Sequence, residues 1–282
     1  MTNTAILNRL AVCSWSLQAQ SPRELVEKVL ATGIRKVQLA LDPLRKAPAA
    51  WGETATELQK NGIAIISGMF GCVGEDYSTL ESIRATGGIA PDETWPQNLE
   101  NIQATARLAA SLNLKLVTFH AGFLPHDPAA REFDTMGTRL QKVADIFAAG
   151  GVEVGLETGQ ENAAGLAAVL RQVNRPNLGV NFDPANIVLY GRGDSVEALR
   201  VLAPWLQQLH IKDATPAVTP GTWGQEVVVG TGVVDWTAFF AVLTELNFAG
   251  VAAIEREAGT NRVRDIRTAK AFIEKLLNSD VV

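Results

Sequence analysis

Cysteine and histidine are scarce in this chain, which has two cysteines and three histidines among its 282 residues. Neither Cys13 nor Cys72 belongs to a CxxC pattern, so we expect no disulfide framework and no thiolate metal site. The N-terminal segment has no basic region before its apolar stretch and no plausible signal-peptide cleavage site. Because reduced cysteines are typical of the cytoplasm, we expect a cytoplasmic protein.

An excess of basic charge and a long apolar run are also missing. The formal net charge of -5 disfavours nucleic acid and anionic membranes as partners, because both are bound by basic surfaces. No uninterrupted apolar run approaches the roughly 20 residues that a membrane-spanning helix needs. We therefore expect no nucleic-acid partner and no membrane partner. The 47% hydrophobic content is enough for a large buried core.

Short apolar runs alternate with longer segments of helical periodicity along the chain. The runs that predict strands are residues 10–17, 36–41, 63–69, 114–120, 152–157, 178–183, 206–211 and 251–255. Amphipathic segments follow them, such as 21–33, which opens with Ser-Pro and closes at a glycine, as helix termini prefer. Eight strand–helix units without a linker predict an α/β fold, a single (β/α)8 TIM barrel over residues 1–282.

A doubly wound open sheet is the alternative fold. It rarely uses eight such regular units, and no GxGxxG motif follows a predicted strand here. Two longer interruptions, residues 74–97 and 213–236, follow the third and seventh strands. In a barrel both would overhang the C-terminal mouth, where TIM barrels build their active sites.

Four acidic or histidine side chains stand at the ends of four consecutive predicted strands. Side chains alternate between the two faces of a strand, and in each of these strands one face is apolar and the other carries polar residues. The polar face includes Glu157, Asp183, His210 and Glu255, so we expect all four to point inward at the mouth. Carboxylates brought together need a counter-charge, because burying unpaired charge is costly. One divalent cation suits this mixture of oxygen and nitrogen ligands. For any one residue alone, the alternative is an ordinary polar group satisfied by loop amides and water.

The segments GLETG, NFDPANIVLYG, LHIKDA and AIERE resemble those of the xylose isomerase-like TIM-barrel family of sugar isomerases and epimerases. The resemblance runs over nearly the whole chain. It implies that Glu157, Asp183, His210 and Glu255 bind a divalent metal, and that Glu157 and Glu255 also act as the acid–base pair. Mn²⁺ is the expected ion, with Mg²⁺, Co²⁺ or Zn²⁺ as alternatives.

Enolisation is the chemistry that such a site supports. A metal ion stabilises the enediolate of a keto-sugar as a Lewis acid, while one carboxylate removes a proton and a second returns one. We therefore expect a sugar isomerase or epimerase, with a keto-sugar or inosose lyase or dehydratase as the alternative. A non-catalytic barrel that binds a ligand or partner also stays open. An endonuclease IV-like activity is disfavoured by the three histidines and the net charge of -5.

Five further residues are candidate substrate contacts, namely Trp15, His120, Asn186, Lys212 and Glu257. His120 ends the fourth strand and either touches substrate or packs as a polar residue. Lys212 either contacts a substrate oxygen or pairs with Asp183 or Asp213. Glu257 either orients Lys212 or is solvated.

The other two candidates follow the first and sixth strands. Trp15 either forms an apolar wall for a sugar or belongs to the core. Asn186 either positions a substrate hydroxyl or a metal ligand, or caps the turn after the sixth strand. Several epimerases of the family that this chain resembles have a histidine where this chain has Asn186. We expect His126 at the surface, a small sugar or keto-sugar as substrate, and leave a homo-oligomer open.

Overall fold

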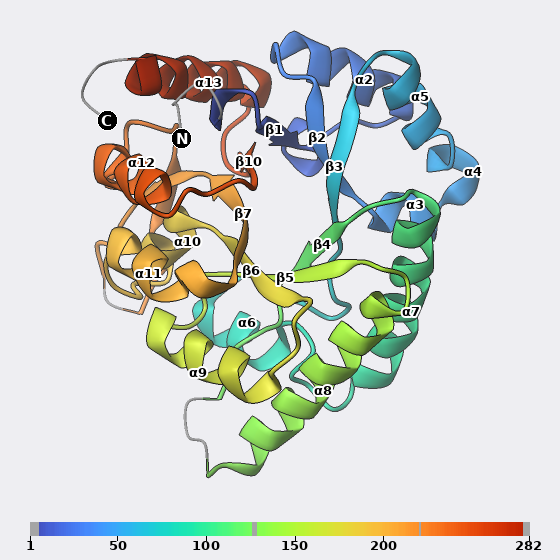
Figure 1. Ribbon diagram of the computed structural model, residues 1–282, viewed down its shortest axis with the longest axis vertical. Coiled ribbons are helices and arrows are strands. Elements are labelled where there is room, and N and C mark those ends of the chain that lie inside the picture. Colours follow the sequence, from blue (N-terminus) through green and yellow to red (C-terminus); the bar gives the residue numbers. More distant parts are fainter. Residues whose placement is uncertain (1–5, 126–128, 220, 279–282) are drawn as a thin grey trace.

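Eight parallel strands close into a barrel, and helices surround it (Figure 1). The computed structural model describes residues 6–125, 129–219 and 221–278, so His126 lies outside the described residues. The barrel strands are β1 (Leu10–Cys13), β2 (Lys36–Ala40), β3 (Ala64–Met69), β4 (Leu116–Phe119), β5 (Glu153–Glu157), β6 (Leu178–Phe182), β7 (Leu206–Ile211) and β10 (Val251–Ile254). They follow chain order around the ring, and β10 closes it by pairing with β1. The predicted (β/α)8 barrel is therefore confirmed.

The helices are joined to the strands by short loops or by the two predicted interruptions. They are α2 (Pro22–Ala31), α3 (Asp42–Lys46), α4 (Pro48–Trp51), α5 (Thr54–Lys60), α6 (Leu80–Thr86), α7 (Trp95–Ser111), α8 (Arg131–Ala148), α9 (Ala163–Val173), α10 (Pro184–Leu189), α11 (Ser195–Leu202), α12 (Trp236–Glu245) and α13 (Arg262–Asn278). The Ser-Pro start of α2 is as predicted: Ser21 Oγ accepts the backbone N–H of Glu24 at 3.2 Å. In the part of the chain that the structure describes, no helix is long and apolar enough to span a membrane.

The first predicted strand is too long. Residues 10–13 form β1, but Ser14–Leu17 form a 3-10 helix, η1. Ser14 Oγ accepts the backbone N–H of Ala40 at 2.8 Å, which ties this turn to the end of β2. Ser16 and Leu17 are buried in η1, so the apolar run continues past the strand, and periodicity alone does not show where the strand ends.

The interruptions contain structure of their own at the mouth. Residues 74–97 include α6 and the start of α7, whereas residues 213–236 include an antiparallel pair, β8 (Asp213–Thr215) and β9 (Gln225–Val227). Asp213 holds this second segment together, because its carboxylate accepts the backbone N–H groups of Gly230 and Gly232 at 2.9 and 3.1 Å. Both interruptions therefore have defined positions from which their side chains can reach the barrel opening.

The barrel has two kinds of interior. Between strands and helices lies an apolar layer in which residues such as Val12, Val37 and Phe182 are completely buried. Inside the ring, the completely or almost completely buried polar side chains are Gln38, Ser67, Thr118, Asn181, Gln208 and His210. Hydrogen bonds link all of these side chains except Ser67, whose Oγ has no hydrogen-bond partner among the described residues. The linked side chains form a polar floor beneath the mouth.

Candidate metal centre and substrate cavity

The four predicted metal ligands come together at the C-terminal ends of β5, β6, β7 and β10. Glu157 and His210 lie at the ends of β5 and β7, while Asp183 and Glu255 directly follow β6 and β10. Each offers one ligand atom within 4.8 Å of the others, and all four side chains are buried. Parallel strands end at the same edge of a sheet, which is why the parity of four separate strands converges on one point.

His210 Nδ1 is the ring nitrogen that faces the carboxylates. It lies 3.2 Å from Glu157 Oε1, 3.4 Å from Glu255 Oε2 and 3.9 Å from Asp183 Oδ2. Ligand bonds of about 2.0–2.4 Å place neighbouring ligand atoms roughly 3–4 Å apart around a divalent ion. The spacing of these atoms therefore fits such an ion.

Two carboxylate oxygens supply an independent test of that fit. Among the described residues, Glu157 Oε2 and Asp183 Oδ2 are buried and have no hydrogen-bond partner. A buried, negatively charged oxygen without a hydrogen bond is costly, and a cation held by these side chains would reduce the cost. The orphaned oxygens and the mixed oxygen and nitrogen donors make Glu157, Asp183, His210 and Glu255 suitable holders of a hard or borderline divalent cation.

The protonation of the four groups reflects their crowding. Burial raises the pKa of Asp183 to about 7. Burial also opposes the charged forms of Glu157 and Glu255, but nearby basic groups outweigh it and leave the pKa of each below its usual value. For His210, burial favours the neutral ring, yet Glu255 and Glu157 outweigh burial and raise its pKa well above the ordinary value. Without a metal, the proton on His210 offsets part of the charge of the two glutamates, and partial protonation of Asp183 removes some of the remaining negative charge.

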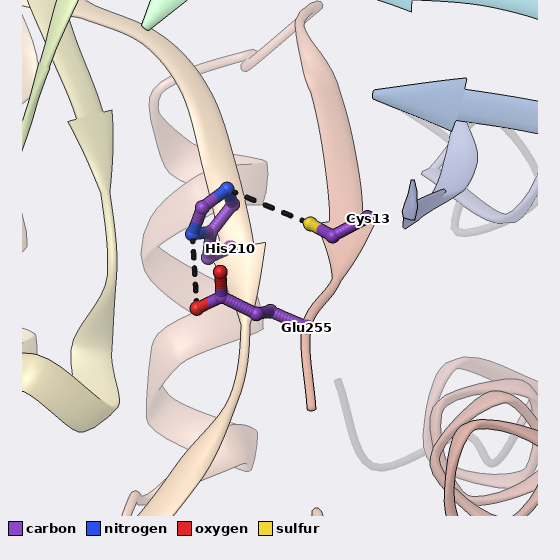
Figure 2. Close-up of side chains that lie close together, drawn as sticks. All are labelled: Cys13, His210 and Glu255. Atoms are coloured by element: carbon purple, nitrogen blue, oxygen red, sulfur yellow. Dashed lines mark hydrogen bonds and ion pairs between the residues drawn. The ribbon is translucent and has the colours of Figure 1, made fainter. Parts of the chain in front are cut away.

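Cys13, His210 and Glu255 form a second group with possible ligand atoms (Figure 2). Cys13 Sγ lies 3.7 Å from His210 Nε2, whereas Glu255 contacts the opposite ring nitrogen, Nδ1. The thiol and the carboxylate thus approach different edges of the ring. Burial raises the pKa of Cys13 to about 12, so its sulfur is held as a thiol and is a poor metal ligand. The group with three carboxylates is the better candidate.

Gln38, which sequence reasoning did not single out, lies beneath His210. Its Oε1 is 2.8 Å from His210 Nε2, and its Nε2 donates to Thr118 Oγ1 at 2.8 Å. An amide oxygen can only accept, so this contact favours a proton on His210 Nε2 and a free lone pair on Nδ1. Asn181 Nδ2 is 3.0 Å from the same Nε2, so this tautomer requires the Asn181 amide to turn its oxygen to the ring and to give up the hydrogen bond that Asn181 Oδ1 accepts from Gln208 Nε2. The sequence held one indication of this role: Gln38 is a polar residue between two apolar ones in a predicted strand, at a position whose side chain points into the barrel.

A cavity of about 460 Å³ opens above the centre, and all five predicted substrate contacts line it: Trp15, His120, Asn186, Lys212 and Glu257. Its wall also contains residues that the sequence did not identify individually: Asp42, Met69, Phe70, Glu75, Tyr77, Leu189, Tyr190, Trp223 and Glu226. Several of these residues come from the two interruptions, and the prediction that the interruptions overhang the mouth was the one indication in the sequence that they would line the cavity. The volume is in the usual range of small-molecule sites, about 300–1,000 Å³.

Each of the two glutamates is held by an N–H from outside the barrel strands. Trp15 Nε1 in η1 donates to Glu255 Oε1 at 2.7 Å. Asn186 Nδ2 in α10 donates to Glu157 Oε1 at 3.1 Å. Asn186 does not cap the turn after β6, because Asp183 Oδ1 accepts the backbone N–H groups of residues 185 and 186. Trp15 and Asn186 therefore both face the cavity and restrain a predicted ligand.

Lys212 and His120 complete the polar contacts at the floor. Lys212 Nζ is buried and donates to Glu255 Oε2 at 2.8 Å and to Glu257 Oε2 at 2.7 Å, and it lies 3.6 Å from Asp183 Oδ2. The pairing of Lys212 with Asp213 is not found, since Asp213 accepts backbone N–H groups of the interruption instead. His120 Nε2 lies 3.5 Å from Glu157 Oε2.

The model of one protein family matches most of the chain. It is described as the xylose isomerase-like TIM barrel, and it matches residues 26–276. The chain belongs to this family. A structure of a xylose isomerase domain protein from Planctomyces limnophilus has a TM-score of 0.85 and 29% identity, covering 95% of this chain and 96% of that chain.

Two other similar proteins have more specific names. An L-ribulose 3-epimerase structure has a TM-score of 0.73 and 20% identity, covering 95% of this chain and 94% of that chain, which shows the shared fold. An inosose dehydratase of Geobacillus kaustophilus (strain HTA426) is 25% identical over 203 residues, 66% of this chain and 54% of that protein. The chain thus spans about half the length of this curated relative. The proteins to which this chain is similar thus have names of more than one reaction type, an epimerase and a dehydratase.

Proposed function

We propose that this protein is a divalent-metal-dependent keto-sugar isomerase or epimerase that works through an enediolate. One observation carries the proposal. Two buried glutamates, Glu157 at the end of β5 and Glu255 directly after β10, place carboxylate oxygens 3.2 and 3.4 Å from His210 Nδ1. When bound, the ion would supply Lewis-acid stabilisation of the negative charge that develops on the substrate oxygens.

Glu157 is the proposed base. Its Oε1 is held by Asn186, while its Oε2 has no hydrogen-bond partner in the described part of the chain and remains free to take a proton. The pKa of Glu157 is lowered, because the neighbouring histidines outweigh burial, so the carboxylate is in its charged form. Asn186 would fix the direction of approach by restraining the other oxygen.

Glu255 is the proposed partner on the opposite face of the substrate. Trp15 and Lys212 hold its two oxygens at 2.7 and 2.8 Å, so its orientation is set from both sides. A proton returned to the same carbon from this face gives an epimer, and one returned to the neighbouring carbon gives an isomer. Lys212 and His120 would contact substrate oxygens, and Glu257 would orient Lys212.

The second candidate is a lyase or dehydratase for a keto-sugar or inosose. It is supported by the relative named inosose dehydratase. Elimination begins with the same removal of a proton by Glu157 and differs in the loss of a leaving group from the next carbon. The products therefore distinguish the two candidates.

Mn²⁺ is the ion that we propose, with Mg²⁺, Co²⁺ or Zn²⁺ as alternatives, since carboxylate and imidazole donors suit all four. A cytoplasmic location also belongs to the proposal. It is supported by Cys13 and Cys72, which are both free thiols, as in reducing compartments.

A screen of keto-sugars in D₂O with added Mn²⁺, followed by NMR, tests the proposal. We expect deuterium to enter a carbon next to the carbonyl of at least one sugar, with an epimer or isomer as product. A dehydrated or cleaved product would favour the second candidate. Tight sugar binding without exchange at any carbon would contradict both and favour a non-catalytic binding barrel.

A further inference from the structure

We infer that the cavity accepts a neutral polyhydroxylated sugar and discriminates against phosphate esters of that sugar. The inference rests on the proposed function and specifies its substrate class. Three observations support it: the charges of the side chains that line the cavity, the ion-pair partners of those side chains, and the hydrogen-bond acceptors that the wall presents to a ligand.

Negative charge predominates in the cavity wall. Five carboxylate side chains line it, from Asp42, Glu75, Glu226, Glu255 and Glu257. Lys212 is the single lysine or arginine among the described lining residues. Its ammonium is already held by Glu255 and Glu257, at 2.8 and 2.7 Å, so it has little capacity left for a second anion.

Nearby arginines offset part of this charge, because they pair with two of the five carboxylates, but they leave no cation free for a phosphate. Arg45 contacts the carboxylate of Asp42, and Arg256 donates to Glu226 Oε1 at 2.8 Å. Neither arginine lines the cavity. Phosphate sites in proteins are usually built from arginine, lysine or a cluster of free backbone N–H groups. The lining residues that the structure describes offer no such set at a distance from the metal centre.

A metal ion does not reverse the balance. The three carboxylates of the centre, from Glu157, Asp183 and Glu255, exceed the charge of a divalent cation before the outer carboxylates are considered. The ion would also engage the carbonyl end of the substrate, whereas the phosphate of a terminal ester lies at the other end. That end would meet Glu75, Glu226 and Glu257, where like charges repel.

The hydrogen-bonding character of the wall leads to the same conclusion. A carboxylate can only accept hydrogen bonds, and a sugar hydroxyl can donate them, whereas an ionised phosphate has acceptor oxygens. Aromatic rings also line the cavity: Tyr190 and Trp223 meet edge to face with ring centres 4.8 Å apart. Acceptors and aromatic rings together match the hydroxyls and the C–H faces of an uncharged sugar.

Matched pairs of ligands test the inference. The Mn²⁺-loaded full chain is titrated by calorimetry with D-fructose, D-tagatose and D-ribulose, and with the terminal phosphate ester of each. We expect every neutral ketose that binds to do so at least about tenfold more tightly than its ester, with a smaller difference at high ionic strength. An ester that binds as tightly as its parent, or more tightly, would overturn the inference.

A charge-neutral variant locates the cause. Glu75→Gln keeps a side-chain oxygen for the backbone N–H of Gly88, which Glu75 Oε1 accepts at 3.0 Å. We expect it to narrow the difference between ketose and ester by about threefold, since one repulsive charge is gone. Glu53→Gln is the matched control, because Glu53 is exposed and does not line the cavity. An equal effect in both variants would assign the difference to net charge and overturn the role of the wall.

Binding and exchange separate this inference from the proposed function. Deuterium exchange in a phosphate ester but not in its parent ketose would contradict the inference and leave the enolising function intact. Preferential binding of neutral ketoses without deuterium exchange in any sugar would support the inference and contradict the enolising function. If neither member of any pair binds, both fail.

Discussion

The side-chain oxygen of Gln38 lies 2.8 Å from His210 Nε2, on the side of the ring opposite to the carboxylates. Gln38 is in β2 and His210 is in β7, so the contact crosses the interior of the barrel. Both side chains are completely buried. A histidine that binds a metal through one nitrogen commonly donates the proton of the other, and here Gln38 is the acceptor.

Replacing Gln38 by methionine should therefore weaken metal binding. Gln38→Met removes the acceptor while nearly keeping the volume, so we expect the Kd for Mn²⁺ to rise by about 10- to 100-fold. Gln38→Glu, which keeps an oxygen there, should retain the affinity better. Calorimetric titration with Mn²⁺ measures both, and ¹⁵N NMR of the histidine reports its tautomer. Unchanged affinity and tautomer in Gln38→Met would show that Gln38 does not position the ring.

Loss of the imidazole itself should remove the ion. We expect His210→Ala to lose bound metal while staying folded, because His210 belongs to the polar interior of the ring and not to the apolar layer between strands and helices. His120→Ala is the control, since His120 lines the cavity 3.5 Å from Glu157 and is not among the four grouped ligands. Elemental analysis together with circular dichroism distinguishes the variants, and full metal content in His210→Ala would refute the ligand assignment.

Neutralising either glutamate should stop proton transfer. Glu157→Gln and Glu255→Gln are each expected to lower turnover by about a hundredfold or more, as loss of a positioned base does. Turnover is measured on the sugar found by the exchange screen, with metal content determined in parallel. If a variant keeps full metal content and a nearly normal rate, the glutamate that it lacks does not transfer a proton in the reaction.

Asn186→Ala should affect kinetics and not stability. Its amide donates to Glu157 Oε1 at 3.1 Å, and Asp183 supplies the helix cap that Asn186 might have provided. We expect kcat/KM to fall by roughly tenfold, because a hydrogen bond to a charged group is lost. Metal content and Tm should change little. A lower Tm with unchanged kinetics would instead show a structural role.

Metal binding should become weaker as the pH falls. The carboxylates of Glu255 and Glu157 outweigh burial and raise the pKa of His210, so the metal-free ring carries a proton that the ion must displace. Each proton displaced lowers the apparent affinity by about tenfold for every unit of pH decrease. Asp183, whose pKa burial raises to about 7, adds to this dependence below that pH.

Calorimetry in buffers of different ionisation enthalpy counts the protons released when Mn²⁺ binds. We expect about one proton above pH 7, from His210, and a larger number below it as Asp183 also becomes protonated. An affinity that stays constant with pH, with no proton released, would show that neither group is protonated in the metal-free protein.

The amino-acid sequence by itself determined the barrel and the point where the four predicted ligands meet. Alternating apolar runs and amphipathic segments specify the strand–helix units, and strand parity directs Glu157, Asp183, His210 and Glu255 to the same edge. These features depend on local periodicity, which one strand or helix expresses without its neighbours. The same periodicity predicted a first strand that is too long, because Ser16 and Leu17 are buried in η1 as they would be in a strand.

The tertiary structure alone decided which partners these residues have. Gln38 is 172 residues from His210 in sequence, and their contact exists only because the ring of strands closes. Trp15 reaches Glu255 from η1, across 240 residues, and Asn186 turns to Glu157 instead of capping its own helix. The charge of the cavity also depends on the two interruptions, which bring Glu75 and Glu226 to its wall. Such contacts follow from chain closure, loop path and side-chain rotamers, which leave no periodic trace in the sequence.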